Sequence, residues 1–251
     1  MNYDALAPND LNFAVRRLPK DIRALLSKYH GTLFCGGGFI RAVVASETPS
    51  DIDLFGTSKD HLTAIAKELQ ATRGGADHCR LHHTKNAITA ICIGRVTVQF
   101  ITRWTFTNAA EVCASFDFTV CQAAIWRDGG DKASPWASAI GEGFYRDLAA
   151  RRLVYTAPVR DEEAGGSLLR AIKYIKRGYT IQIGSLAGVI ARLTRTVDAK
   201  RCDLSNESAC HRVLHGLLQE VDPTIIVDGL ELTDDHETPD DTMGPNVPDA
   251  A

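Results

Sequence analysis

The sequence predicts an α+β protein in which a sheet flanked by helices comes first and helices alone follow. Before residue 156, apolar residues alternate along several short runs, as they do in half-buried strands, and recur at helical spacing between those runs. From Glu162 onward only the helical spacing remains. The helices expected there span residues 162–177, 185–197 and 206–220.

This change of pattern divides the chain into three parts. We expect a head domain over residues 1–156 and a small helical neck domain over residues 157–230. The last 21 residues contain seven acidic residues, no lysine or arginine, and no apolar periodicity. Residues 231–251 are therefore expected to form a disordered acidic tail.

Composition places the chain among ordinary globular proteins. Of its 251 residues, 45% are hydrophobic and 24% are charged, and its net charge is -3. The first residues lack a signal peptide, and no apolar run is long enough to span a membrane. Its seven cysteines include no C-x-x-C pair, which favours reduced thiols. We therefore expect a cytoplasmic protein without a membrane partner.

The first elements of the head follow from local patterns. Apolar residues at helical spacing run over residues 11–29, with a new helix expected near Pro19 or Lys20, because proline is tolerated in a first turn. "GTLFCGGG" predicts a strand that enters a glycine turn, and "FIRAVVAS" predicts a short helix. "SDIDLFG" predicts a second strand, and "KDHLTAIAKELQAT" predicts an amphipathic helix.

The remaining elements of the head are a hairpin, a helix, a strand, a loop and a helix. "AITAICIG" and "VTVQFIT" are apolar runs joined at Gly94-Arg95, a hairpin signal. Asn108 and Glu111 have capping-box spacing, so a helix is expected to follow Asn108. "FTVCQAAIW" predicts a strand. A polar loop is expected from Arg127 to Gly143, and a helix over residues 144–152.

Two carboxylates within an apolar strand point to chemistry. Asp51 and Asp53 alternate with Ile52 and Leu54, so both acidic side chains lie on one face of the strand. Like charges at that spacing repel each other unless a cation lies between them, and a divalent metal ion is the usual solution. The preceding glycine turn lets backbone N–H groups approach a phosphate. The combination predicts a pair of Mg²⁺ ions that bridge nucleotide phosphates.

The segment that contains these residues resembles the signature of the DNA polymerase β-type nucleotidyltransferases. It is similar to the head domain of the CCA-adding tRNA nucleotidyltransferases and bacterial poly(A) polymerases, in which G-G-x-[VI]-R-D precedes D-x-D. The matching residues are Gly37, Gly38, Ile40, Arg41, Asp51 and Asp53.

Three later segments extend the resemblance over roughly residues 31–183. "FDFTVCQAAIW" is similar to R-R-D-F-T-[IV]-N-A, and "DLAARRLVY" to D-L-x-x-x-x-[LI]-R. "SLLRAIKYIKRGYTI" is similar to R-L-L-R-A-x-R-F-x-x-x-x-G-[FY]-x-I. Several motifs in the same order make the resemblance specific. It implies a small mixed sheet flanked by helices and followed by a short all-helical neck.

The resemblance also implies roles for individual residues. Asp51 and Asp53 would bind two Mg²⁺ ions and act as the catalytic pair. The expected nucleotide-binding residues are Gly37, Gly38, Arg41, Asp117 and Arg170. Among these, the glycines would hold the triphosphate, Asp117 would lie near the ribose, and Arg170 near the nucleotide.

Several positions depart from the family pattern. The aspartate after the motif arginine is Ala42, the arginine before the second-motif aspartate is Phe116, and the asparagine after "FTV" is Cys121. Gln99 stands where a carboxylate is expected, so a metal site would depend on Asp51 and Asp53.

The template that selects bases departs as well. The family's E-D-x-x-R has Ala164 and Ser167 in place of its aspartate and arginine. Neither residue can replace a pair that hydrogen-bonds a base edge, so programmed CCA synthesis is not expected.

These observations lead to a metal-dependent nucleotidyltransferase. It would transfer NMP from an NTP to an acceptor hydroxyl and release pyrophosphate, with an RNA 3′ end as the leading acceptor. A protein or small-molecule acceptor is one alternative, and a catalytically silent nucleotide-binding or interaction protein is another. The basic stretch from Arg170 to Arg177 fits either a solvated helix face or an RNA contact. The clusters "HCRLHH" and Cys210/His211/His215 leave zinc binding open, and the sequence does not define an oligomeric state.

Overall fold

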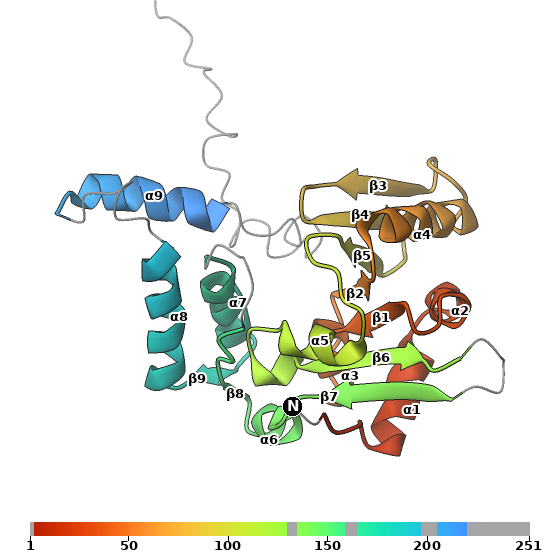
Figure 1. Cartoon of the computed structure of the whole chain (residues 1–251), viewed down its shortest axis with the longest axis horizontal. Helices are drawn as coiled ribbons and strands as arrows, with labels where there is room; N and C mark the ends of the chain where they lie inside the picture. Colours follow the sequence, from red (N-terminus) through yellow and green to blue (C-terminus); the bar gives the residue numbers. More distant parts are fainter. Residues whose placement is uncertain (1–2, 130–134, 159–164, 197–204, 220–251) are drawn as a thin grey trace, which may run out of the picture.

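The structure is a computed structural model that describes residues 3–129, 135–158, 165–196 and 205–219. Its head is built on a seven-stranded sheet with the order β3-β4-β5-β2-β1-β6-β7 (Figure 1). All neighbouring strands are antiparallel except β2 and β5, which are parallel, so the sheet is mixed as expected. The strands are β1 Leu33–Gly36, β2 Asp51–Gly56, β3 Cys79–His83, β4 Ala87–Cys92, β5 Thr97–Ile101, β6 Ala123–Arg127 and β7 Trp136–Ile140.

Helices cover both faces of this sheet. The helices of the head are α1 Pro8–Arg17, α2 Lys20–Lys28, α3 Gly38–Val44, α4 Lys59–Thr72, α5 Ala109–Ala114 and α6 Phe144–Ala149. The larger core includes Ile52 and Leu54 from one face of β2 together with apolar residues of α1 to α4. The smaller core joins Phe55, from the other face of β2, to Val112 of α5. Asp51 and Asp53 alternate with Ile52 and Leu54, so they share the α5 face.

Helix boundaries follow the signals in the sequence. Pro19 separates α1 from α2. The Ser58 hydroxyl accepts a hydrogen bond from the His61 N–H at the start of α4, and the Asn108 side chain accepts one from the Glu111 N–H at the start of α5. Each cap satisfies a backbone donor that has no partner within the helix. The helix predicted from the capping box after Asn108 is therefore confirmed.

Three local expectations need correction. "FTVCQAAIW" is not one strand, because a 3₁₀ turn at Thr119–Cys121 precedes β6. The segment from Arg127 to Gly143, expected to be a loop, contains β7, which pairs with β6. The residues of β7 do not alternate clearly between apolar and polar, so the sequence gives no signal of this strand. Strands also continue beyond residue 156, since β9 Thr180–Ile181 pairs in parallel with β8 Arg152–Leu153. Tertiary contacts form these short strands, which leave no periodicity in the sequence.

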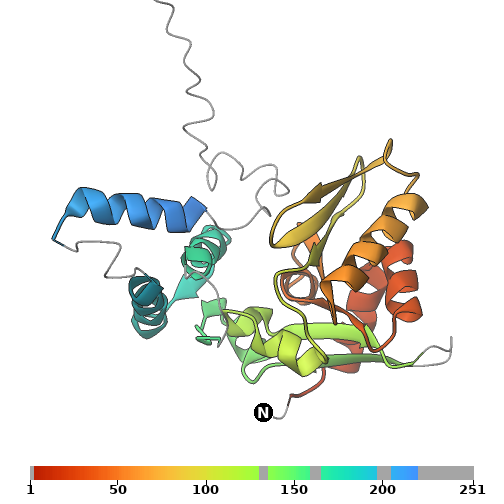
Figure 2. The ribbon, with the colours of Figure 1, turned by 45° about the horizontal axis from the view of Figure 1, so that its top comes forward.

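The neck consists of helices α7 Gly165–Lys176, α8 Ile183–Thr196 and α9 Glu207–Gln219, grouped beside the head (Figures 1 and 2). They match the three helices expected after Glu162. The division into head and neck near residue 156 remains a prediction. The expected tail over residues 231–251 and the template position Ala164 lie outside the described residues.

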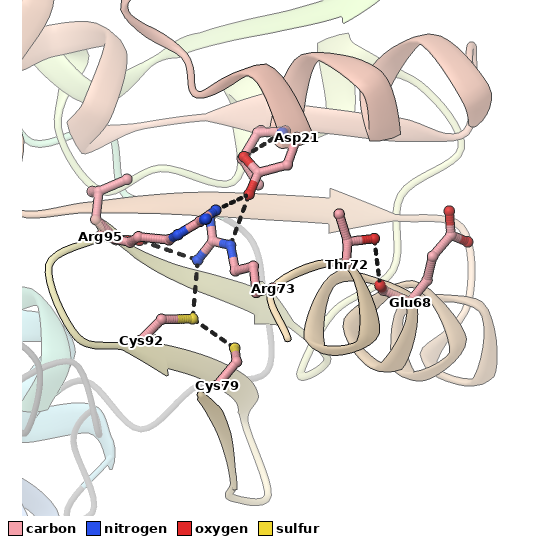
Figure 3. A network of polar contacts seen from close by, with 9 residues as sticks. Asp21, Glu68, Thr72, Arg73, Cys79, Cys92 and Arg95 are labelled. Carbon is pink, nitrogen blue, oxygen red and sulfur yellow. Dashed lines mark hydrogen bonds and ion pairs between the residues drawn. The ribbon is translucent and has the colours of Figure 1, made fainter. Parts of the chain in front are cut away.

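A charged cluster joins α2, α4 and the β4–β5 turn (Figure 3). The Arg73 Nε donates to Asp21 Oδ2 at 2.8 Å, and Arg95 Nη1 lies 3.3 Å from the same oxygen. Arg73 Nη1 also donates to the Cys92 Sγ at 3.5 Å and to a backbone carbonyl. The Cys79 and Cys92 thiols face each other across β3 and β4, and neither forms a disulfide. The cluster thus connects the end of α4 to α2, to β4 and to the turn before β5.

Within the described part of the chain, no helix combines the length and the apolar character that crossing a membrane requires.

Candidate active site

The glycine turn between β1 and α3 forms one wall of the candidate site. Gly37 has φ 75° and ψ -130°, a conformation that favours glycine strongly. A Cβ at Gly37 would lie 2.7 Å from the Phe116 ring, closer than real Cβ contacts. The Gly37 N–H donates to the Ala123 carbonyl at 3.0 Å, which holds the turn against β6. The turn therefore requires glycine both for its backbone angle and for its contact with Phe116.

The two aspartates of β2 lie directly beside this turn. Gly36 of β1 pairs with Asp53, so the end of the glycine strand meets the second carboxylate. Asp51 is 9% exposed, and its Oδ1 accepts a hydrogen bond from the Ser50 hydroxyl at 2.8 Å. The structure thus brings together the glycine turn and the carboxylate pair that the sequence singles out.

Gln99 completes the polar surface next to the aspartates. The parallel register of β2 and β5 places Gln99 opposite Asp53, and the Gln99 Nε2 donates to Asp51 Oδ2 at 3.3 Å. Gln99 is 0% exposed, and its Oε1 has no hydrogen-bond partner among the described residues. A buried amide oxygen without a partner is rare in proteins and needs an explanation.

The donor set fits a hard divalent cation. Asp51, Asp53 and Gln99 offer carboxylate and amide oxygens, which are the ligands that Mg²⁺ prefers. The described residues, the candidate site included, contain no group of three or more His, Cys, Asp or Glu that could hold a metal ion, so this set has two carboxylates and one amide. The cluster "HCRLHH" lies instead on and before β3, with the Cys79 thiol buried and His83 exposed.

Asp117 and Arg170 come together although they are far apart in the sequence. They form an ion pair between the bend that precedes the 3₁₀ segment and α7. The Ser167 hydroxyl donates to the other Asp117 oxygen at 3.1 Å. The Asp117 side chain is only 2% exposed, whereas that of Arg170 is 31% exposed. Two of the predicted nucleotide-binding residues therefore meet at the junction of head and neck.

Arg41 occupies a different place from the other predicted site residues. Its guanidinium forms an ion pair with Glu47 and donates to the Tyr179 hydroxyl at 3.0 Å. The rings of Tyr174 and Tyr179 lie 5.2 and 5.6 Å from its central carbon. Arg41 is 2% exposed, and both of these polar contacts are made by its Nη1, whereas its buried Nε has no hydrogen-bond partner among the described residues. A role in nucleotide binding remains a prediction for Arg41.

Phe116 lies between the glycine turn and the segment that contains Asp117. Its ring contacts the glycine turn and packs edge-on against Phe55 at 5.6 Å between centroids. Its carbonyl accepts a hydrogen bond from the Thr156 hydroxyl. An apolar ring thus covers the turn at the position where the resembling family has an arginine. Sequence reasoning identified the substitution but not this contact, which depends on tertiary packing.

Asp147, from the segment "DLAARRLVY", fixes the 3₁₀ segment next to the site through a hydrogen bond from Thr119. It is 0% exposed and accepts hydrogen bonds from Thr119 and Arg152. Burial alone would raise the pKa of Asp147, but hydrogen bonds from Arg146, Arg152 and Thr119 outweigh burial and lower it. The Asp147 carboxylate therefore holds the 3₁₀ segment that follows Asp117.

Solved structures of CCA-adding enzymes share this architecture. The Thermotoga maritima CCA-adding enzyme complexed with tRNA aligns with a TM-score of 0.52 at 16% identity, covering 90% of this chain and 59% of that enzyme. Complexes of CCA-adding enzyme with CTP and with ATP align with TM-scores of 0.54 and 0.51, at 16% and 18% identity. These alignments cover 93% of this chain and 55% and 54% of those enzymes. The chain therefore shares the fold of these CCA-adding enzymes, and it spans less than two thirds of their length.

A family model identifies the chain more closely. The model of the Gabija anti-defense 2 family matches residues 9–151, which is more than half of the 251 residues. The chain therefore belongs to the Gabija anti-defense 2 family. No curated protein matches the sequence.

Proposed function

We propose that this protein is a metal-dependent nucleotidyltransferase that transfers NMP from an NTP to an acceptor hydroxyl. The observation that carries the proposal is the placement of Asp51 and Asp53 beside the glycine turn, on a fold shared with CCA-adding enzymes. In the reaction, an acceptor oxygen forms a bond to the α-phosphorus, and the bond to the β-phosphate oxygen breaks. The proton of the acceptor hydroxyl passes to solvent water, and pyrophosphate leaves.

Each part of the site has a task in this reaction. Asp51 and Asp53 would hold one or two Mg²⁺ ions, which neutralise phosphate charge and lower the pKa of the attacking hydroxyl. The glycine turn at Gly37 and Gly38 would hold the triphosphate. Because the Gly37 N–H already donates to the Ala123 carbonyl, the backbone N–H of Gly38 would make the contact. Asp117 and Arg170 would orient the nucleotide at the head–neck junction.

The leading acceptor is an RNA 3′ end in the cytoplasm. Support comes from the CCA-adding enzymes of the same fold, whose structures are complexes with tRNA, CTP and ATP, and from the basic residues of α7. The family description favours a second candidate, transfer to a protein or small molecule of a defence system, because it names an anti-defense role. Both candidates use the same carboxylate pair and differ only in the acceptor.

Labelled NTPs test the reaction and identify the acceptor class. The full chain is incubated with each α-³²P-labelled NTP and Mg²⁺, together with total RNA, a bacterial protein lysate or a small-molecule extract. The products are sized on denaturing gels and by chromatography, and pyrophosphate is measured in parallel. Label in RNA supports the leading acceptor, whereas label in a protein band or a small molecule supports the second candidate.

Matched variants connect the activity to the site. Asp51→Asn and Asp53→Asn should each abolish transfer while the circular dichroism spectrum stays unchanged, because each removes a charged ligand. Asp60→Asn is the control, since Asp60 is an exposed carboxylate in the first turn of α4. Wild-type turnover in either site variant would refute the assignment, and absence of pyrophosphate release from the wild type with every acceptor would favour a catalytically silent protein.

A further inference from the structure

Gln99 is a buried amide with one half of its hydrogen-bonding capacity unused. It lies on β5 opposite Asp53, on the same face of the sheet as both aspartates. Its Nε2 donates to Asp51 Oδ2 at 3.3 Å, while its Oε1 has no partner among the described residues. At 0% exposure, the oxygen has no contact with bulk water to compensate. Leaving such an oxygen without a partner costs free energy, and a cation bound beside Asp51 would give this oxygen a partner once the amide rotates toward it.

An amide can interact with a carboxylate in two ways. Its N–H donates to a bare carboxylate, as the contact with Asp51 shows. Rotation by about 180° around the last side-chain bond exchanges the nitrogen and the oxygen without displacing the rest of the residue. In the rotated state the carbonyl oxygen faces Asp51, which is favourable only when a cation lies between the two. The same side chain can therefore serve the site with and without a metal ion.

We propose that Gln99 is the third metal-ligand side chain of the Asp51–Asp53 site, and that it binds through its neutral carbonyl oxygen. This inference rests on the proposed metal dependence of the enzyme. Together, two aspartates and one amide carry one negative charge less than three carboxylates. Because cation affinity rises with the number of charged ligands, the site binds a divalent ion more weakly than a three-carboxylate site would.

The neutral ligand also has a consequence without metal. A glutamate at position 99 would place a third carboxylate beside Asp51 within a buried surface, and the repulsion would destabilise the metal-free fold. The amide avoids this repulsion and adds a hydrogen bond to Asp51. Compared with a glutamate, Gln99 therefore lowers the affinity for the metal ion and raises the stability of the metal-free protein.

Binding of Mn²⁺ by the full-length protein tests the proposal without requiring activity. Free Mn²⁺ is measured by electron paramagnetic resonance during titration, and thermal unfolding is followed in EDTA and in MnCl₂. Gln99→Met removes the ligand and should weaken Mn²⁺ binding about tenfold. Gln99→Glu adds a charge and should strengthen binding about tenfold or more, with a lower melting temperature in EDTA. Thr89→Val is the matched control, because Thr89 is the buried register partner of Gln99 on β4 and its hydroxyl also has no described partner.

A spectroscopic signature separates a ligand from a packing residue. The side-chain ¹H–¹⁵N signals of Gln99 are assigned by their absence from the spectrum of Gln99→Met. In the wild type these signals should shift when Mg²⁺ is added. In Asp51→Asn the addition of Mg²⁺ should leave them unchanged. The proposal is overturned if Gln99→Met and Gln99→Glu both bind Mn²⁺ as the wild type does, or if the signals do not respond to Mg²⁺. If instead the wild type and Asp51→Asn bind Mn²⁺ equally poorly, the proposed metal dependence itself fails.

Discussion

Replacing Arg73 by methionine should destabilise the head through one buried charge. The Arg73 side chain is 1% exposed and that of Asp21 is 10% exposed, so the substitution leaves a carboxylate in a site with little water. Breaking a buried ion pair by removing one partner costs about 3–5 kcal/mol. Arg95 remains near the same oxygen, but its side chain is 54% exposed and its contribution is correspondingly small. We therefore expect Arg73→Met to lower the free energy of unfolding by about 3 kcal/mol.

Urea denaturation measures this change directly, with Arg95→Met as the matched control. At about 2–4 °C per kcal/mol for a chain of this size, the melting temperature of Arg73→Met should fall by about 6–12 °C. The expected loss for Arg95→Met is at most about 1 kcal/mol. In Asp21→Asn/Arg73→Met the stranded charge is absent, so part of the loss should be recovered. Equal stability of the two arginine variants would refute the reasoning, because it would show that burial does not set the strength of this cluster.

Three further predictions concern the site and its supports. Gly37→Ala should abolish nucleotide transfer and lower the melting temperature, because φ is 75° and the new Cβ would meet the Phe116 ring; adding Phe116→Ala should restore only part of the stability, and full recovery would exclude backbone strain. The pKa of Asp147 is lowered in the folded state, so its stabilising contribution is present above the unfolded pKa of about 3.9 and disappears as pH falls through the folded pKa. Urea titrations at pH 7 and pH 3 should therefore show a smaller difference for Asp147→Asn than for the wild type, and an equal difference would contradict the assignment. Base choice should be loose, because Ser167 is 0% exposed and its hydroxyl donates to Asp117; competition among the four NTPs at equal concentration should give incorporation ratios within about tenfold, and strict CCA addition would contradict this.

The sequence predicts the local elements of the site well because each has a short-range cause. The glycines, the alternation at Asp51 and Asp53, and the caps at Ser58 and Asn108 act within a few residues of the chain. The α+β class and the β4–β5 hairpin follow from periodicity and are confirmed.

The contacts that the sequence does not predict all join distant segments. No local signal indicates that Glu47 and Tyr179 would enclose Arg41, or that Ser167 would donate to Asp117. The pairing of β8 with β9 belongs to the same group, since two residues are too few to show an alternation. Burial of polar side chains depends on which elements pack together. The pattern of residues along a single sequence does not show which distant elements will be in contact.

The contacts of Asp117 join α7 to the part of the head that carries the proposed nucleotide-binding residues. Both Asp117 oxygens are held from α7, one by Ser167 and one by Arg170, while its backbone carbonyl accepts from Thr156 at the end of the head. A change in the position of α7 would therefore change the orientation of the Asp117 carboxylate. It would also disturb Arg41, because Tyr174 and Tyr179 pack on its guanidinium from the same helix and the turn that follows it. An acceptor of the proposed reaction that contacts α7 would therefore act on the proposed nucleotide-binding residues Asp117 and Arg41 through these contacts. The chain offers this connection within 54–59% of the length of the CCA-adding enzymes that share its fold.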